Sequence, residues 1–476
     1  MRYIGVDLGT TGCKCIVFGG GGEPLSQSYF EYDLIHRGGL IEQDADLWWS
    51  LVQRAVRESV AACPGGARDV SALAVSSQGI SFVPVDETGI ALHNAISWLD
   101  NRALPQAERI AGEFGERGVF LRTGKRINPC YTLPKLLWMR EELPDLYRRT
   151  SKFLMGMEYI TCRMTGKAVT DYSMASGTMA FDITSRQWDR DLLEACGVDA
   201  AKLPDIGCAG SFVGEIQAAA GLGLPEGVKV YLGAQDQKCA AIGAGIRGGV
   251  AAVSLGTATA VSMLCGAPVL DSGMRIPCFS LDDNRWILEA VVGTSGASLR
   301  WLRDTVFAGA DYETITEQAV KSPAGANGVM FFPHLQGATS PWWVSSAAGT
   351  LHGLTLATSR ADIARAVLEG VAFQIAANLR ALEEISGEAV EELRLFGGGA
   401  KSALWRRIIA DAAGKTVSVP HTVETANLGA AMLAGLGGDA LPPPRAVVQP
   451  GLESTRRYQD LMTDYFALQE RLLNFT

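Results

Sequence analysis

Two short turns rich in glycine and threonine are the parts of this sequence best suited to chemistry. The first, Leu8-Gly9-Thr10-Thr11-Gly12, follows the apolar run Tyr3–Asp7. The second, Leu255-Gly256-Thr257-Ala258-Thr259, follows the apolar run Gly249–Ser254. Such turns offer successive backbone N–H groups and hydroxyls to a phosphate without needing net positive charge. One turn is weak evidence, but one in each half of the chain predicts a clamp for a triphosphate.

Two aspartates stand where they could assist phosphate chemistry. Asp7 directly precedes the first turn, where a carboxylate can bind Mg²⁺ directly or through water. Asp236 stands at the start of a predicted helix, whose dipole favours a carboxylate. A carboxylate is a weak base, which suits phosphoryl transfer because the nucleophile needs little activation. Plain structural roles stay open, Asp7 as a turn cap and Asp236 as a helix N-cap.

Cys13 and Cys15 follow the first turn and raise the alternative of a metal or redox site. The second turn lacks cysteines, no CxxC pair occurs among the ten cysteines, and the five histidines form no HxxxH or HExxH pattern. Alternate residues of a strand share a face, so we expect both cysteines in the core. Lys14, between them, is a candidate for contact with the phosphates.

A third glycine turn, Gly397-Gly398-Gly399, lies between a predicted strand and a helix expected from about Ser402 to Ala412. Glycines at such a junction let a flat ligand approach the backbone. Neither GxGxxG nor GxxxxGK[ST] occurs at any of these turns, so the sequence gives no support to Rossmann or P-loop binding. A purely structural turn remains an alternative.

Candidate groups for a second substrate lie in the first half of the chain. Gln78 stands in the turn Ser76-Ser77-Gln78-Gly79, and Trp98, Asp100 and Arg102 share one loop. Trp98 offers a carbon-rich face, while the three polar side chains suit a polyol. Each residue alone also fits an ordinary loop.

The elements around these residues alternate between strands and helices. The opening hairpin precedes a helical run, Asp46–Ala62, and two further strands, Val70–Val75 and Ile80–Val85. The pattern is α/β in character, and its restart at Gly249 predicts two related domains that face each other across a cleft. With 476 residues, the chain also exceeds what one hydrophobic core usually supports.

We place the domain boundary in the glycine-rich stretch 243–249, which gives an N-terminal domain of residues 1–246 and a C-terminal domain of residues 247–476. After the proline run that starts at Leu441, the apolar spacing predicts a helix over residues 455–475 that docks on the body of the protein.

The formal net charge of −9 argues against nucleic-acid and anionic-membrane partners, which require a basic face. The sequence has no apolar run of the ~18 residues that a membrane span needs, and no secretory leader pattern opens it. We therefore expect a cytoplasmic protein.

Together these residues resemble the FGGY family of carbohydrate kinases, and more closely its xylulokinase-like branch. Asp7–Gly12 with Lys14 is similar to the family's first phosphate segment, and Ser254–Thr257 to its second. Tyr131–Trp138 and the stretch from Gly349 to Glu369 resemble the two family signatures. The resemblance extends over about residues 1 to 440.

The resemblance implies a duplicated actin-like ATPase (ribonuclease H-like) α/β fold, with two domains flanking a deep catalytic cleft that binds ATP, Mg²⁺ and a small sugar or polyol. It implies that Asp236 is the general base and that Asp7 helps to hold Mg²⁺. The remaining implied contacts are Gln237 with the acceptor; Gly9, Thr10, Thr11, Gly256 and Thr257 with phosphates; and Gly296, Gly398, Gly399 and Ala400 with the rest of the nucleotide.

One departure from the family pattern concerns the acceptor. Where xylulokinases carry Gln-Met-His-Gly, this chain has Gln78-Gly79-Ile80-Ser81, and the Arg-Glu pair of glycerol kinases is absent too. Asp100 of the Trp-x-Asp-x-Arg loop is kept, so we expect a polyol. A ketopentose such as xylulose is our first expectation.

Several alternatives stay open. The same fold could act on glycerol, erythritol, an aldonic acid or a hexulose. An actin-like or chaperone-like ATPase is a further alternative, although the tail after Leu441 is too short for a separate binding module. A homodimer is one option for the assembly.

Overall fold

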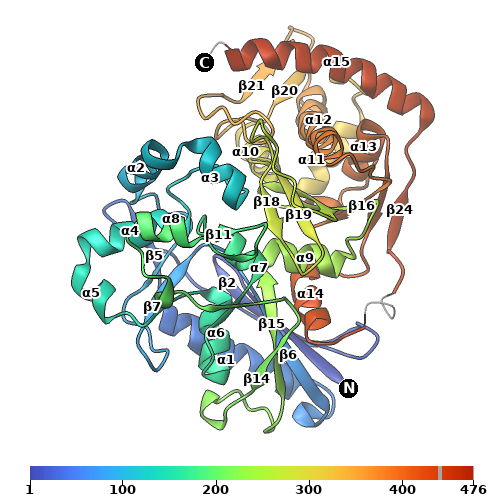
Figure 1. Ribbon diagram of the computed structural model, residues 1–476. Coiled ribbons are helices and arrows are strands. Elements are labelled where there is room, and N and C mark those ends of the chain that lie inside the picture. Colours follow the sequence, from blue (N-terminus) through green and yellow to red (C-terminus); the bar gives the residue numbers. More distant parts are fainter. Residues whose placement is uncertain (438–441, 475–476) are drawn as a thin grey trace. The chain divides into compact units, whose positions relative to one another are not determined.

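The computed structural model describes residues 1–437 and 442–474 (Figure 1). The chain divides into two compact units. Unit 1 comprises Met1–Gly243, Gly266–Ile287 and Glu424–Pro442, and unit 2 comprises Ala244–Cys265, Leu288–Val423 and Pro443–Thr476. Both are α/β in architecture, as the sequence predicts.

The main sheet of unit 1 has the strand order β14-β15-β6-β1-β2-β3. β1 is antiparallel to β2 and parallel to β6, and β6 is parallel to β15. The carboxyl ends of β1, β6 and β15 therefore meet at one edge of the sheet. The bounds are β1 Arg2–Leu8, β2 Gly12–Phe18, β3 Pro24–Glu31, β6 Val70–Ser77, β14 Phe212–Glu215 and β15 Lys229–Gln235.

A second sheet of unit 1 has the order β4-β5-β8-β7-β9 and carries the loop in which Trp98 lies. Its strands are β4 Ile35–Arg37, β5 Leu40–Gln43, β7 Phe82–Val85, β8 Ala95–Ile96 and β9 Lys152–Met155. The strand predicted from Ile80 starts at Phe82 instead, because Ile80 belongs to a tight turn described below.

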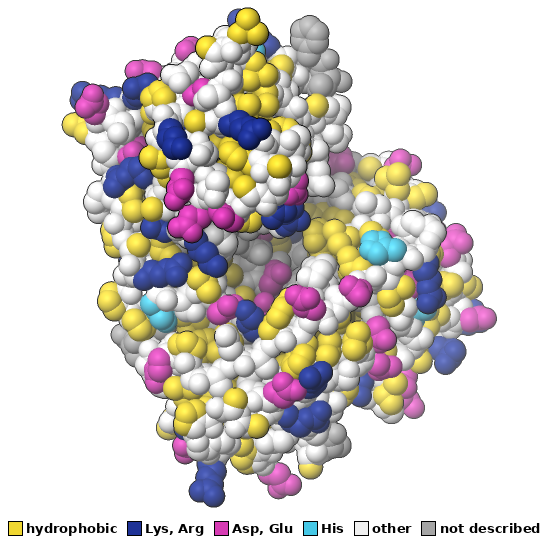
Figure 2. Space-filling view, turned by 180° about the vertical axis from the view of Figure 1, so that it is seen from behind, with side chains coloured by type: hydrophobic (Ala, Val, Ile, Leu, Met, Phe, Trp, Pro, Cys, Tyr) yellow, Lys and Arg dark blue, Asp and Glu magenta, His cyan; other side chains and the backbone are white. Residues whose placement is uncertain are grey.

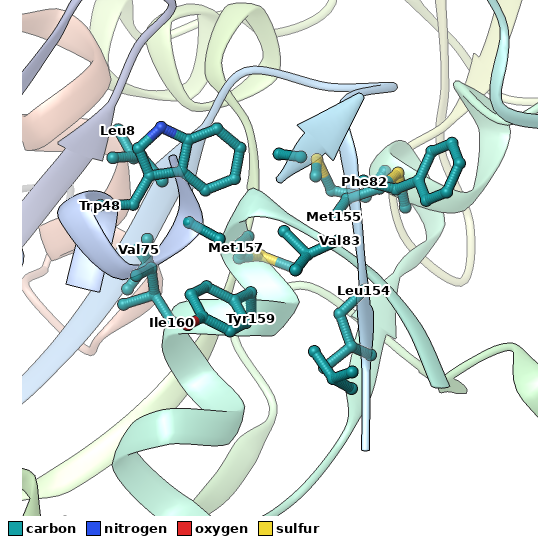
Figure 3. Close-up of a cluster of buried hydrophobic side chains, with 14 of the residues drawn as sticks. Leu8, Trp48, Val75, Phe82, Val83, Leu154, Met155, Met157, Tyr159 and Ile160 are labelled. Carbon is teal, nitrogen blue, oxygen red and sulfur yellow. The ribbon is translucent and has the colours of Figure 1, made fainter. Parts of the chain in front are cut away.

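Apolar side chains from both sheets and from two helices pack together in unit 1 (Figure 3). The helices are α1 (Ala45–Ala62), the helix predicted at Asp46, and α6 (Gly156–Thr165). Leu8 of β1, Trp48 of α1 and Tyr159 of α6 are fully buried in this cluster. Because Leu8 is the last residue of β1, this packing fixes the strand end from which the first glycine turn leaves.

A segment near the end of the sequence also belongs to unit 1. Asn427 of α14 (Thr425–Leu433) donates hydrogen bonds to the backbone oxygens of Gly5 and Lys14, at 3.0 and 3.1 Å. A Cβ added at Gly5 would lie 1.9 Å from the Asn427 backbone oxygen, so only glycine permits this contact. The compact units therefore differ from the domains predicted from the sequence at residues 266–287 and 424–442. The boundary at 246/247 stays a prediction.

In unit 2, neighbouring strands of the main sheet follow the order β19-β17-β16-β22-β23-β24. β16 is antiparallel to β17 and parallel to β22, β22 is parallel to β23, and β23 is antiparallel to β24. These directions repeat those of unit 1, as the recurring hairpin predicts. The bounds are β16 Val250–Leu255, β17 Thr259–Cys265, β19 Trp286–Val292, β22 Glu392–Phe396, β23 Thr416–Val419 and β24 Ala446–Val448.

The last helix, α15 (Leu452–Asn474), packs on unit 2 through buried Tyr458, Met462 and Tyr465. The Tyr465 ring stacks on Phe332 of β20 with centroids 4.3 Å apart. Its hydroxyl accepts a hydrogen bond from Gln374 of α12 at 3.0 Å. The bounds of these partners are β20 Met330–Phe332 and α12 Arg360–Ser386.

The remaining elements connect or cover these sheets. The helices are α2 Leu104–Phe114, α3 Glu116–Thr123, α4 Thr132–Glu142, α5 Pro144–Arg149, α7 Tyr172–Ser176, α8 Arg190–Ala195, α9 Asp236–Ala244, α10 Gly296–Thr305, α11 Tyr312–Val320 and α13 Ala403–Ala413. The short strands are β10 Val169–Asp171, β11 Phe181–Asp182, β12 Gln187–Trp188, β13 Asp205–Gly207, β18 Cys278–Ser280 and β21 Thr350–His352.

The surface carries charges of both signs. Figure 2 shows basic and acidic side chains interspersed over the visible face, in keeping with the modest net negative charge. None of the helices described is both long and apolar enough to cross a membrane.

Candidate active site

Three predicted site residues leave the sheet of unit 1 at one edge. Asp7 of β1 pairs in register with Ser76 of β6, and Ser76 pairs with Ala234 of β15. Gln78 and Asp236 follow β6 and β15 directly, so both start from the edge at which Asp7 lies. The parallel strands thus gather two carboxylates and an amide from positions 7, 78 and 236.

The Asp7 carboxylate is partly buried and held in place. Its Oδ1 accepts a hydrogen bond from the Ser76 hydroxyl at 2.7 Å. Burial raises the pKa of Asp7 to about 6, although Ser76 and Lys14 act in the opposite direction. Because burial disfavours the ionised form, a nearby cation would stabilise the ionised carboxylate of Asp7.

We tested whether Asp7 fits the Mg²⁺ that the resemblance implies. The described residues contain no cluster of three or more histidine, cysteine, aspartate or glutamate side chains that could hold a metal. Mg²⁺ bound with a nucleotide usually takes only one or two carboxylates, its other ligands being waters and substrate phosphates. A single, partly buried carboxylate beside a phosphate turn therefore fits this ion, and Asp7 is the residue that would hold it.

Lys14 and the two cysteines lie in β2. Lys14 is opposite Asp7 in the hairpin, and its Nζ lies 2.8 Å from Glu424 Oε1. The ammonium group thus has an acidic partner within unit 1, a contact that the sequence did not indicate. Cys13 and Cys15 are both buried, and burial raises the pKa of Cys15 to about 12 and that of Cys13 well above its usual value. Both thiols are core groups, as predicted.

Asp236 is the first residue of α9, the helix predicted to begin near Gln237. Its Oδ1 accepts two hydrogen bonds of 2.6 Å, one from the backbone N–H of Gln237 and one from the side-chain amide of Gln235. Both donors fix the direction of the carboxylate.

A chain of amides connects Gln78 to the first glycine turn. Gln43 Nε2 donates to the Thr10 backbone oxygen at 2.7 Å, and Gln78 Nε2 donates to Gln43 Oε1 at 2.9 Å. Because a backbone carbonyl can only accept, it fixes the orientation of Gln43 and, through it, that of Gln78. The buried Gln78 Oε1 accepts no hydrogen bond within the described part of the chain. Gln78 therefore has an acceptor to offer to a hydroxyl.

Trp98 reaches the same turn from the neighbouring sheet. Its indole N–H donates to the Thr10 hydroxyl at 3.1 Å, and about 38% of the residue surface is exposed. The structure thus brings Trp98, Gln78 and the turn Gly9–Thr11 together. Sequence reasoning missed Gln43, which connects them. Neither its residue type nor its spacing distinguishes it from the ordinary residues of the strand and helix cap around it.

Asp100 and Arg102 are buried in their loop. The two oxygens of Asp100 accept from the Arg102 guanidinium and from the backbone N–H of Ile41, and Arg102 also pairs with Glu42 at 3.0 Å. Burial alone would raise the pKa of Asp100, but these hydrogen bonds lower it below its usual value. Asp100 has no exposed surface and Arg102 almost none. Here the pair holds the loop that carries Trp98.

The turn after Gln78 has an unusual backbone. Ile80 has φ +73°, and the Ser81 N–H donates to the Gly79 oxygen two residues back, at 2.8 Å. This is the strained type of three-residue turn, which is rare for a β-branched residue. Thr132 Oγ1 donates to the Ile80 oxygen at 3.0 Å and helps to hold the turn. Such strain is often found at functional sites.

The second phosphate turn and most of the residues predicted to contact the rest of the nucleotide lie in unit 2, around a pocket of about 910 Å³. Glycines from three turns of unit 2 line it, namely Gly256, Gly296 and the pair Gly398-Gly399. A Cβ added at Gly296 would lie 2.5 Å from the Gly256 backbone oxygen, and one added at Gly399 would lie 2.5 Å from Leu255 Cδ2. Only glycine allows these approaches, and the pocket is large enough for a nucleotide. Its lining includes Gly256, Thr257, Gly296, Gly398, Gly399, Leu299, Arg300, Tyr312, Glu313 and Ser402.

Two outcomes in this pocket differ from the sequence prediction. Ala400 is fully buried and is not among the lining residues, whereas Gly398 and Gly399 are. Tyr312 and Glu313 of α11 line the pocket but were not predicted. Their helix has an ordinary amphipathic pattern, so the sequence contains no signal for this role.

Models of two domains match the chain. The N-terminal domain of the FGGY family of carbohydrate kinases matches residues 2–243, and its C-terminal domain matches residues 251–437.

Individual relatives are similar over nearly the whole chain. A xylulose kinase of Bacillus subtilis is 32% identical over 92% of this chain and 88% of that protein. A gluconokinase of Bacillus licheniformis is 29% identical over 99% of this chain and 96% of that protein. The crystal structure of ligand-bound xylulose kinase from Lactobacillus acidophilus superposes with a TM-score of 0.92 at 27% identity, covering 99% and 98% of the two chains.

Proposed function

The chain belongs to the FGGY family of carbohydrate kinases, and we propose that it transfers the γ-phosphoryl group of ATP to a terminal hydroxyl of a ketopentose such as xylulose. The observation that carries this proposal is the position of Asp236, at a sheet edge shared with Asp7 and Gln78. The xylulose kinases among the relatives support the choice of acceptor.

In the proposed reaction, Asp236 takes the proton of the acceptor hydroxyl. The hydroxyl oxygen forms a bond to the γ-phosphorus, the bond to the β,γ-bridging oxygen breaks, and ADP leaves. A carboxylate suffices as base because the proton moves late in such a transfer. Mg²⁺, held by Asp7, would supply charge neutralisation at the phosphates.

The two glycine turns have the complementary role of binding phosphate oxygens through backbone N–H groups and hydroxyls. We assign Gly9, Thr10 and Thr11 to one set of contacts and Gly256 with Thr257 to the other. The three-glycine turn and Gly296 would lie against the rest of the nucleotide, since the pocket they line in unit 2 has a suitable size.

Gln78 and Trp98 are our candidates for contact with the acceptor. Gln78 offers a fixed amide oxygen to a hydroxyl, and Trp98 offers a half-exposed ring to the carbon side of a sugar. Gln237, next to the base, is assigned to the acceptor on the family resemblance. We further propose that the enzyme acts in the cytoplasm, without nucleic acid, and that it forms a homodimer.

An aldonic acid is the second candidate acceptor, because gluconokinases are also among the relatives. An ADP-release assay with a panel of ketopentoses, polyols and aldonic acids separates the candidates. We expect ADP formation to depend on a sugar and kcat/KM to be highest for a ketopentose. ATP turnover that is indifferent to every acceptor would overturn the kinase proposal and favour an actin-like or chaperone-like ATPase.

A further inference from the structure

Gln235, the residue before the proposed base, is held rigidly at the end of β15. It pairs in register with Ser77 of β6. Its backbone N–H donates to the Ser173 hydroxyl at 3.0 Å, and Ser173 is itself buried at the start of α7. The main chain of Gln235 is thus fixed from two sides, so its side chain leaves the strand in a defined direction.

The Gln235 side chain turns toward Asp236. Its Nε2 lies 2.6 Å from Asp236 Oδ1. A carboxylate can only accept here, so the nitrogen of the amide faces Asp236 and the orientation of the amide is settled by chemistry. The amide oxygen, Oε1, is buried and accepts no hydrogen bond among the residues that the structure describes. The amide is therefore oriented by its contact with the carboxylate alone.

Gly79 provides the room for this arrangement. A Cβ added at Gly79 would lie 3.0 Å from Gln235 Cγ, 3.7 Å from Nε2 and 3.8 Å from Cδ. A larger side chain at position 79 would therefore press on the amide. Gly79 is also the first residue of the strained turn at Ile80, so the turn that follows Gln78 and the amide beside the base are packed against each other.

The hydrogen bonds from Gln235 and Gln237 to Asp236 end on the same oxygen. Gln237 N–H and Gln235 Nε2 each donate to Oδ1, and neither of these donors binds Oδ2. A donor favours the ionised form of a carboxylate and fixes its rotation about the Cβ–Cγ bond. Among the neighbouring charged groups, Asp7 of β1 and Asp171 before α7 act on Cys239 of α9, and Lys238 of α9 acts on Asp171.

We infer that Gln235 is a positioning residue for phosphoryl transfer: it keeps the Asp236 carboxylate ionised and directs Oδ2 toward the acceptor hydroxyl. This inference rests on the proposed function, in which Asp236 is the base. Gln235 itself takes no proton and makes no bond to phosphorus, so its loss weakens the base without removing it.

The test compares Gln235→Leu and Gln235→Glu with the wild-type enzyme in pH profiles of kcat/KM for the best acceptor. The Gln235→Leu variant lacks the amide donor. The Gln235→Glu variant keeps the shape of the side chain but places a second carboxylate beside Asp236. We expect the acid limb of the profile to move up by about one pH unit for Leu and further for Glu. At pH values below both limbs this corresponds to a loss of about tenfold in kcat/KM, which shrinks toward neutral pH, whereas KM for ATP should be unchanged.

Ser173→Ala is the matched control, since it loosens the backbone anchor of Gln235 but keeps the amide donor. It should lower the thermal stability and move the acid limb less than Gln235→Leu does, because the amide donor is kept. If Gln235→Leu and Ser173→Ala give the same profile as the wild type, or if both move it equally, Gln235 has no positioning role. Failure of the proposed function has a different signature, because the wild-type enzyme would then show no acceptor-dependent ADP formation at all.

Discussion

The main sheets of the two units have the same strand order and directions but carry different residues at the equivalent edge. β1 ends with Asp7-Leu8, whereas β16 ends with Ser254-Leu255. β15 is followed by Asp236, and β23, its counterpart, is followed by Pro420. The edge in unit 1 therefore has carboxylates that the edge in unit 2 lacks. The same arrangement of strands therefore carries the candidate acid–base residues in unit 1 and a nucleotide-sized pocket in unit 2.

The glycine turns of the two units can be compared in the same way. In the first turn, a Cβ added at Gly9 would meet only the Gly12 oxygen, at 3.5 Å, which is an ordinary contact. Its counterpart in unit 2, Gly256, would likewise meet only a backbone oxygen, that of Ala258, at 3.5 Å, and the close approach of unit 2 lies instead at Gly296, 2.5 Å from the Gly256 oxygen. The two phosphate turns are thus equally open, and the pocket of unit 2 differs in the close packing of Gly296 against the second turn, whereas the candidate site residues of unit 1 are polar side chains held by hydrogen bonds.

The largest effect on nucleotide binding should come from the close contact in unit 2. Gly296→Ala must separate the start of α10 from the turn at Gly256, and a displacement of this kind can lower catalysis about 100-fold. We expect KM for ATP to rise by about that factor while the acceptor still binds, as measured by steady-state kinetics and calorimetry. Gly248→Ala is the control, because its added Cβ meets nothing within 4 Å. Equal effects of both variants on KM for ATP would contradict the steric argument.

The ionised carboxylate of the partly buried Asp7 in unit 1 should lower the free energy of unfolding. The pKa of Asp7 in the folded protein, about 6, lies above its ordinary value of 3.8, so the folded protein favours the neutral carboxyl. This contribution to the free energy of unfolding is fully present below pH 3.8 and is lost as the pH rises through 6. Asp7→Asn should therefore raise the free energy of unfolding at pH 8 by about 3 kcal/mol, and by much less at pH 4.

Urea denaturation with EDTA present measures this difference without a metal contribution. The same variant should lose most of its phosphorylation activity. A variant less stable than the wild type at pH 8, or a difference independent of pH, would show that burial of the Asp7 charge is not the dominant effect.

A smaller effect is expected from the chain of amides in unit 1, in which Gln43 connects Gln78 to the first glycine turn. Gln43→Leu removes the bond to the Thr10 oxygen and leaves Gln78 free to turn. A hydrogen bond of this type contributes about 1 kcal/mol, so KM for the acceptor should rise about fivefold, with little change in KM for ATP. Gln53→Leu removes another amide-to-carbonyl bond of unit 1, from Gln53 to Ala220, and should leave both constants unchanged.

The sequence predicted the parts of the fold that rest on local patterns. The repeated hairpin correctly indicated two similar α/β sheets, because strand alternation and glycine turns are local signals. The incorporation of α14 into unit 1 was not predictable, since it depends on Asn427 meeting Gly5 across more than 400 residues of sequence.

The same distinction applies to the candidate site. Asp7, Asp236 and the glycine turns stand at strand ends, where residue type and position suffice for a prediction. Gln43 and Gln235 act through hydrogen bonds to other site residues, and no pattern identifies such a partner. Asp100 was recognised by its motif, but only the structure shows that Arg102 and Ile41 occupy its oxygens.

The central claim is that acid–base chemistry belongs to unit 1 and nucleotide binding to unit 2, and Asp236→Asn tests it most directly. The change removes the proposed base in unit 1 and leaves the pocket of unit 2 intact. We predict that acceptor-dependent ADP formation falls about 10³-fold, while the dissociation constant of a non-hydrolysable ATP analogue, measured by calorimetry on the same sample, is unchanged. Undiminished acceptor-dependent turnover in this variant would contradict the account.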